Sequence, residues 1–291
     1  NIKYNNILNN MSNSLISHED VSNMLKMSML VYNYGKDFQL KENEDIEHFV
    51  NNLKNSDEHK NNVSLSNIRK NALIDLSKEC PHGKIIKFIN DDETDLQVVV
   101  SVSETKKRIS VVFRGSESVK DWYYDLYIFK QQLDTGAKVH KGFYTQLVKN
   151  GNYGKLTKII KEQLNIHNDY SIYVSGHSLG GALCTLFGYL LAHEIENHVT
   201  VISFASPRVG DTVWKNTFTN KENLKHIRVT NYHDIVTAAP IINYKHVGHV
   251  IHLKPLDFKI YSDFSYNMCW YYSLFKNHSI SDHNCDLYYA R

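Results

Sequence analysis

The sequence predicts an α/β fold in which helices cover both faces of a mostly parallel central sheet. From residue 171 onward, apolar β-prone segments alternate with helix-forming segments, an order typical of parallel sheets. Residues 171–186 (SIYVSGHSLGGALCTL) compress a strand, a sharp turn and the start of a helix around Ser178. Polar residues follow several of the predicted strands, which places them at the carboxyl edge of the sheet, where such folds carry their functional groups.

Composition and charge narrow the classes of protein to which the chain can belong. It has 291 residues, of which 42% are hydrophobic, so it can bury a sizeable core. The formal net charge of +2 gives no reason to expect a nucleic-acid partner. No apolar stretch approaches the length of a membrane span, so we expect a soluble protein or one that contacts a membrane peripherally.

The cysteines indicate no metal site. Cys80, Cys184, Cys269 and Cys285 lack the short spacing of metal ligands. Cys184 falls in a predicted helix and is expected to be a small core residue. Cys269 and Cys285 could form a disulfide in an oxidising compartment, but the sequence does not require it. Three N-x-S/T sequons slightly favour a secreted or luminal protein, and the oligomeric state is not indicated.

Asparagine usage and hydrophobic periodicity divide the chain into an N-terminal extension, residues 1–83, and a main domain, residues 84–291. Within the extension, apolar residues recur at helical spacing over 21–34, which predicts an amphipathic helix packed on the main domain. Residues 41–71 are charged and rich in asparagine, and we expect a loosely helical insertion or surface appendage there.

The main domain opens with strands. Residues 96–102 and 109–113 are β-prone and joined by a polar turn, which predicts an antiparallel hairpin. Residues 144–164 predict a helix that leads to the strand before Ser178. Further strands are predicted at 84–89, 199–205, 227–230 and 250–253.

The segment 117–129 has two interpretations. It gathers apolar and aromatic side chains, including Trp122, Tyr123 and Leu126, on one face of a predicted helix. Amphipathicity alone favours an ordinary helix packed on the core. The other interpretation is a mobile lid whose aromatic face covers an apolar cleft and turns outward at a lipid surface.

The pattern G-x-S-x-G around Ser178 indicates a nucleophile elbow. Gly176 and Gly180 are required because the turn is strained and the flanking backbones pack too closely for a Cβ. The serine hydroxyl is then held above the sheet, and the backbone N–H of Leu179 points to where an oxyanion would form. The alternative is a glycine-rich turn with a solvent-exposed serine.

A serine nucleophile needs a histidine base, and the histidine needs a carboxylate that fixes its tautomer. Asp234 follows a predicted strand and is flanked by core residues, so it is the favoured acid. Asp211 follows the preceding strand and is better explained as a helix N-cap after the Pro207–Arg208 turn.

The base is sought among the five histidines that follow the acid. His252 alternates with apolar residues in a strand, and His246 and His249 are expected to hydrogen-bond loop backbone. His278 and His283 lie beyond the last strand, where the base of this architecture belongs. His283 is preferred and His278 remains an alternative.

Seven motifs in order resemble those of the class 3 lipases, a fungal and plant triacylglycerol-lipase family within the α/β-hydrolases. The resemblance covers about residues 96–290. The motifs are VVFRGSESVKDWYYDL, VHKGF, GHSLGGALCTL, FASPRVGD, VTNYHDIV, KHVGHVIHL and SDHNCDLYY. The resemblance implies an α/β-hydrolase fold with a helical lid over the site.

Carried over position by position, the resemblance implies functional roles. Ser178 would be the nucleophile, Asp234 the acid and His283 the base. Ser116 would be the oxyanion residue, acting with the Leu179 N–H. Within the lid, Trp122 would be the family's tryptophan, beside Tyr123 and Leu126.

The sequence also departs from the family pattern. Ala205 stands where the family usually has a glycine. Residues 254–282 form an aromatic-rich insertion before the base, so the position of His283 depends on where this insertion ends.

The resemblance implies a serine hydrolase of long-chain acylglycerol esters that acts at a lipid–water interface through an acyl-enzyme. Neither a metal nor an organic cofactor is expected for this chemistry. A phospholipase A1 or a feruloyl-type carboxylesterase on the same fold is the nearest alternative. A catalytically silent, lipase-like binding protein is a further one.

Overall fold

The computed structural model describes residues 16–33, 42–46, 71–72, 74–76, 83–116, 129–255, 257–261 and 280–291. The predicted lid residues Trp122, Tyr123 and Leu126 lie outside this part of the chain, as do His278 and most of the aromatic insertion.

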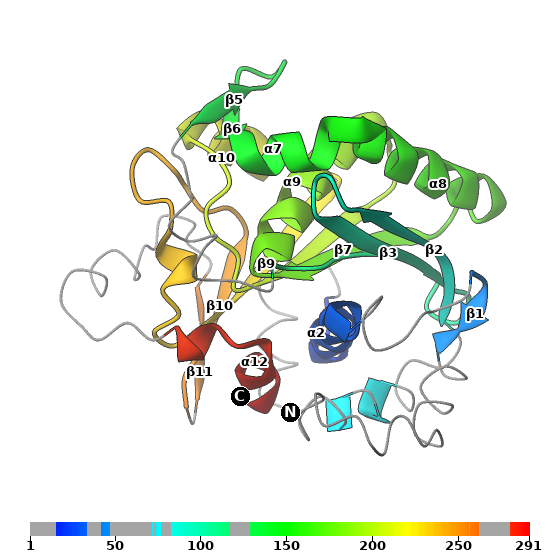
Figure 1. The fold of residues 1–291 in the computed structure, drawn as a ribbon, viewed down its shortest axis with the longest axis horizontal. Helices are drawn as coiled ribbons and strands as arrows, with labels where there is room; N and C mark the ends of the chain where they lie inside the picture. Colours follow the sequence, from blue (N-terminus) through cyan, green and yellow to red (C-terminus); the bar gives the residue numbers. More distant parts are fainter. Residues whose placement is uncertain are drawn as a thin grey trace.

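In the described part of the chain, nine strands form one sheet in the order β1-β2-β3-β4-β7-β8-β9-β10-β11 (Figure 1). The pairs β4–β7, β7–β8, β8–β9 and β9–β10 are parallel, whereas the pairs on either side of this central block are antiparallel. The predicted hairpin is β3 paired with β4. The strand bounds are β1 Glu44–Asp45, β2 Gly83–Asp91, β3 Leu96–Ser103, β4 Arg108–Phe113, β7 Ser171–His177, β8 Val199–Phe204, β9 Leu224–Asn231, β10 His249–Leu253 and β11 Phe258–Tyr261.

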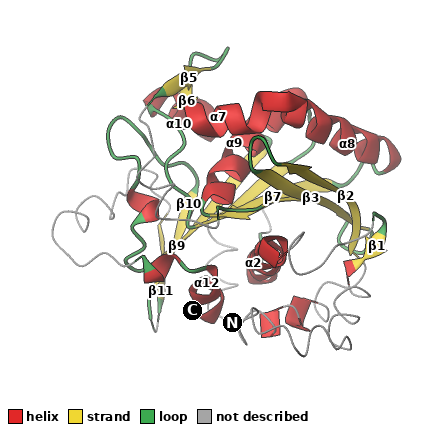
Figure 2. Cartoon of the chain, viewed as in Figure 1, coloured by secondary structure: helices red, strands yellow, loops and turns green. Residues whose placement is uncertain are grey.

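Helices cover both faces of this sheet (Figure 2). One face carries α7 (Lys141–Val148), α8 (Asn152–Ile166), α9 (Leu179–Glu194) and α10 (Thr212–Thr219), and the other carries α2 (His18–Asn33) and α12 (Cys285–Ala290). Each face has its own apolar core, so the sheet is buried on both sides as a parallel sheet requires. The remaining elements are the paired strands β5 (Lys130–Gln132) and β6 (Lys138–His140) and the short helices η1 (Lys149–Gly151), η2 (Val236–Ala238) and η3 (Ser281–His283).

The single helix predicted over residues 144–164 is wrong, because the chain breaks there into α7 and α8. Asn150 and Gly151 both adopt left-handed backbone angles, with φ of 56° and 71°. Asparagine and glycine tolerate this conformation better than other residues, so the pair ends one helix and starts the next. None of the helices in the described segments has the length and apolarity needed to cross a bilayer.

Helix α2 is built to dock on the sheet. Ser17 and Asp20 form a capping box at its start, because each backbone N–H donates to the other residue's side chain at 3.0 Å. The Asp20 carboxylate also pairs with Arg108 on β4, and both side chains are buried. Burial alone would raise the pKa of Asp20, but the ion pair and hydrogen bonds with Arg108 hold it below its usual value.

We expect Asp20→Ala to lower the free energy of unfolding by about 3–5 kcal/mol, because it leaves the Arg108 guanidinium buried without its carboxylate. Urea denaturation followed by circular dichroism measures this loss. Glu19→Ala is the matched control, since Glu19 pairs with Lys106 in an exposed bridge worth under about 1 kcal/mol. Equal losses for the two variants would contradict the prediction.

Candidate active site

Ser178 occupies a strained turn between β7 and α9. Its φ and ψ are 60° and −123°, a conformation that costs a non-glycine residue about 1–3 kcal/mol. The backbones around it are packed too closely for side chains. A Cβ on Gly176 would lie 2.3 Å from the Gly180 carbonyl oxygen, and one on Gly180 would lie 2.4 Å from the Phe113 carbonyl oxygen. The glycines therefore permit the turn that presents the serine hydroxyl.

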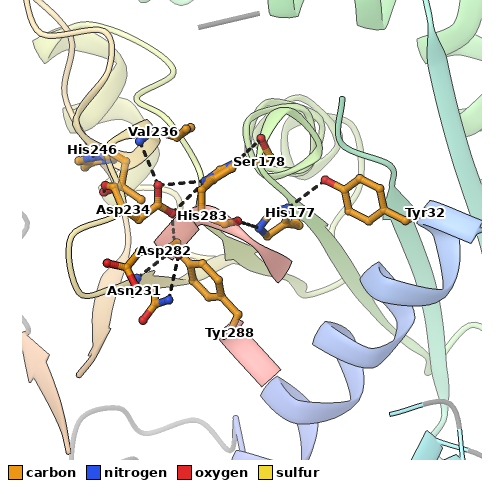
Figure 3. Close-up of polar contacts among 11 residues, drawn as sticks. Tyr32, His177, Ser178, Asn231, Asp234, Val236, His246, Asp282, His283 and Tyr288 are labelled. Carbon is orange, nitrogen blue, oxygen red and sulfur yellow. Dashed lines mark hydrogen bonds and ion pairs between the residues drawn. The ribbon is translucent and has the colours of Figure 1, made fainter. Parts of the chain in front are cut away.

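His283 lies between Ser178 and Asp234 (Figure 3). Its Nε2 is 2.7 Å from Ser178 Oγ, and its Nδ1 is 2.9 and 3.0 Å from the two carboxylate oxygens of Asp234. A carboxylate only accepts hydrogen bonds, so Nδ1 carries the proton. Nε2 is then the acceptor for the Ser178 O–H, which is the orientation that general-base catalysis needs.

Asp234 is held on both of its oxygens. The backbone N–H of Val236 donates to Oδ1 at 3.0 Å, and the Tyr288 hydroxyl donates to Oδ2 at 2.6 Å. The carboxylate therefore points at His283 in one orientation. Sequence reasoning assigned Tyr288 no such role, because a contact between residues 54 positions apart has no local pattern.

The turn that carries His283 is tied down by its neighbours. Asn231 donates from its side-chain amide to the Asp282 carbonyl at 2.9 Å. The Arg291 guanidinium pairs with the Asp282 carboxylate at 3.0 Å and donates to Asn231 Oδ1 at 2.6 Å. These contacts fix the residue before the imidazole. Asn231 lies in the motif VTNYHDIV, but sequence reasoning assigned a role to neither Asn231 nor Arg291.

The two residues expected at the oxyanion position lie on the same cavity. Ser116 follows β4 at its carboxyl end, and Leu179 is the first residue of α9. Both line a cavity of about 640 Å³, together with Phe129, His140 and Phe143. Phe129, Phe143 and Leu179 give this cavity an apolar wall that suits an acyl chain, charged side chains complete its lining, and the N-terminus of α9 suits a developing negative charge.

The other acidic and histidine candidates have structural contacts. Asp211 caps α10, because its carboxylate accepts from the Trp214 N–H at 2.9 Å. His246 Nε2 donates to the Thr237 carbonyl at 2.7 Å. His252 Nδ1 lies 3.0 Å from the Thr230 hydroxyl, and burial lowers its pKa to about 4, so it stays neutral at pH 7.

Ala205, which departs from the motif, adopts a φ of 53° and is fully buried. Only glycine takes this left-handed conformation without steric cost, so the alanine stores roughly 1 kcal/mol of strain. Its N–H donates to the Val229 carbonyl at 3.0 Å, which links β8 to β9 behind the elbow.

The serine hydrolases of α/β fold are defined by a strained serine between a parallel strand and a helix. In these enzymes the serine is hydrogen-bonded to a histidine, and the histidine is hydrogen-bonded to an aspartate. Residues 110–244 match the family described as "Lipase (class 3)". The expected resemblance to the class 3 lipase family and the expected α/β-hydrolase fold are both confirmed.

Named relatives agree with this family. The chain is 32% identical over 163 residues to a lipase of Rhizomucor miehei, covering 54% of this chain and 44% of the relative. It is 33% identical over 179 residues to phospholipase A1-II 3 of Oryza sativa subsp. indica, covering 51% and 43%. The chain thus spans less than half the length of these two relatives.

A solved structure of the Rhizomucor miehei triacylglyceride lipase superposes with a TM-score of 0.63 at 27% identity. The match covers 71% of this chain and 81% of the other.

Proposed function

We propose that the protein is a serine esterase that hydrolyses long-chain acylglycerols at a lipid–water interface. The observation that carries this proposal is the hydrogen-bonded line from Asp234 through His283 to Ser178. Ser178 acts as the nucleophile, His283 as the base and Asp234 as the acid. The match to the class 3 lipase family supports ester hydrolysis, and the cavity lined by Ser116 and Leu179 supports an acyl substrate.

The reaction proceeds through an acyl-enzyme. Ser178 Oγ attacks the ester carbonyl carbon while its proton passes to His283 Nε2. The carbonyl oxygen becomes an oxyanion, which the Leu179 N–H and Ser116 stabilise, each donor being worth about 3 kcal/mol. His283 then protonates the leaving alcohol as the C–O bond breaks. Water repeats the sequence, releases the fatty acid and returns the proton to Ser178.

We assign the predicted lid, with Trp122, Tyr123 and Leu126, the role of controlling access. Ser178 is 0% exposed, so an ester reaches its hydroxyl only after a covering segment moves. Two large apolar side chains, Phe129 and Ile242, are 65% and 64% exposed. They belong to neighbouring segments, since the Tyr244 hydroxyl donates to the Phe129 carbonyl at 3.2 Å. Such side chains favour contact with a lipid surface.

Substrate preference tests the proposal. We expect hydrolysis of tributyrin to rise steeply once its concentration passes the solubility limit, because an interface stabilises the open lid. A pH-stat titration measures the acid released. Phosphatidylcholine and methyl ferulate serve as comparison substrates for the phospholipase A1 and feruloyl-esterase alternatives. Preferential hydrolysis of phosphatidylcholine or of methyl ferulate would assign the protein to the corresponding alternative. Absence of hydrolysis of all three esters would refute the proposed esterase function.

A further inference from the structure

The side chain of His177 links the N-terminal helix to the turn that carries the base. His177 Nδ1 lies 2.9 Å from the hydroxyl of Tyr32 on α2, and His177 Nε2 lies 2.9 Å from the main-chain oxygen of His283 (Figure 3). These contacts join segments 145 and 106 residues apart. His177 immediately precedes the nucleophile and thus lies between α2 and the catalytic turn.

The chemistry of the atoms sets the direction of both hydrogen bonds. The His283 carbonyl oxygen only accepts, so His177 Nε2 must carry a hydrogen. In the neutral imidazole the lone pair is then on Nδ1, which accepts from the Tyr32 O–H. The tyrosine hydroxyl therefore stabilises the tautomer of His177 that holds the His283 backbone.

The same hydroxyl also packs against the segment that leads to Ser116. A Cβ on Gly115 would lie 2.0 Å from Tyr32 Oη and 2.5 Å from the His177 carbonyl oxygen. The Gly115 backbone therefore lies against the Tyr32 hydroxyl. Three segments meet at this point: the one before Ser116, the elbow and the turn of His283.

We propose that Tyr32, acting through His177, is a positioning residue for His283, so that helix α2 helps to set the catalytic rate. Helix α2 lies outside residues 110–244, which carry the family match. The inference rests on the proposed function. Tyr32 does not contact the substrate in this proposal. Its role is to determine where the imidazole of His283 lies.

Docking of α2 does not depend on this hydroxyl. The ion pair of Asp20 with Arg108 anchors the start of the helix, and Ser28 Oγ lies 3.2 Å from Ser175 Oγ on β7. Met24, Met29 and Leu30 are each 1% exposed in the core beneath the sheet. Removing one hydroxyl from Tyr32 should therefore leave α2 in place. Proton transfer is more sensitive, because it requires the imidazole within about 0.5 Å of its productive position.

Tyr32→Phe tests the proposal, with Ser28→Ala as its control. We expect Tyr32→Phe to lower kcat for p-nitrophenyl butyrate about tenfold while KM stays within twofold of wild type, because substrate binding is untouched. Ser28→Ala removes a hydrogen bond between the same helix and the sheet. It should lower Tm by a similar amount and keep kcat within twofold. Equal kcat values for Tyr32→Phe and wild type would overturn the proposal.

His177→Gln distinguishes positioning from a general loosening of the helix. A glutamine amide nitrogen reaches the place of His177 Nε2 and still donates to the His283 carbonyl, but it offers Tyr32 no equivalent of Nδ1. Adding Tyr32→Phe to His177→Gln should then cost less than twofold in kcat, since the two residues act through one contact. A full tenfold additional loss would overturn the proposal.

Two further observations keep the test decisive. If Tyr32→Phe does not fold, His177→Asn replaces it in the test. Asparagine is too short to reach the His283 carbonyl, so we expect the kcat of His177→Asn to be at least fivefold below that of His177→Gln. Equal rates for those two variants would overturn the proposal. Wild-type protein without esterase turnover would refute the proposed function itself, whereas an active wild type with an equally active Tyr32→Phe refutes only the positioning role.

Discussion

Ser178→Ala is expected to lower kcat for p-nitrophenyl butyrate by on the order of 10⁶ and to abolish covalent labelling by an organophosphonate. The serine oxygen is the attacking atom in the proposed reaction, and within the described part of the chain it is the hydroxyl hydrogen-bonded to His283 Nε2. Mass spectrometry of the phosphonate-treated protein measures the labelling directly. Turnover within tenfold of wild type would exclude Ser178 as the nucleophile.

The chain supplies a matched control for this experiment. Ser203 Oγ lies 2.7 Å from His226 Nε2, the same separation as in the Ser178–His283 pair, and Ser203 is also fully buried. Among the described residues His226 Nδ1 has no hydrogen-bond partner, and burial keeps the pKa of this histidine well below its usual value. Without a carboxylate on the imidazole the pair lacks the third member of a triad. We expect Ser203→Ala to keep kcat within twofold of wild type.

Asp234→Asn is expected to reduce kcat about 10⁴-fold with little change in Tm. The Val236 N–H needs an acceptor at the Oδ1 position, so the new amide nitrogen takes the Oδ2 position, 3.0 Å from His283 Nδ1. That nitrogen is a donor facing Nδ1, and the neutral amide oxygen 2.9 Å from Nδ1 holds the Nδ1–H more weakly than the carboxylate did, which favours the tautomer of His283 with its proton on Nε2. The imidazole then points a hydrogen at Ser178 and can no longer accept the serine proton.

Stopped-flow or steady-state kinetics with a thermal melt check this prediction. Asp211→Asn is the control, because asparagine also caps a helix and Asp211 contacts Trp214 rather than the site. A loss below tenfold for Asp234→Asn would exclude the carboxylate as the acid of the triad. A loss accompanied by unfolding would instead assign Asp234 a role in stability.

The sequence predicted the parts of the site that local patterns encode. Gly176 and Gly180 flank the serine because the turn needs them, and the structure has the strained φ that they permit. The order of the strands favoured Asp234 as the acid. The position after the last predicted strand left His278 and His283 as candidate bases, and the family resemblance selected His283. The break at Asn150 and Gly151 was not predicted, although residues 149–152 are polar and the Asn-Gly pair is itself a turn signal.

Contacts between distant segments could not be predicted in this way. Tyr32 belongs to an amphipathic stripe that indicates only packing, and its hydroxyl finds His177 through the relative placement of α2 and β7. Tyr288 and Asn231 meet at Asp234 for the same reason, since the Asn231 N–H donates to the Tyr288 hydroxyl at 3.0 Å. Such partners have no fixed spacing, so a single sequence gives no signal for them.

The residues of the site are far apart in the sequence, so we expect the site to form late in folding. The bonds from His283 to Asp234 and Ser178 close chain loops of 49 and 105 residues, and the bond from Tyr32 to His177 closes one of 145. Closures of this length form slowly compared with local helices. During renaturation, ester turnover would therefore return only after helical circular dichroism had recovered, which makes enzymatic activity a stricter reporter of the native state than secondary structure.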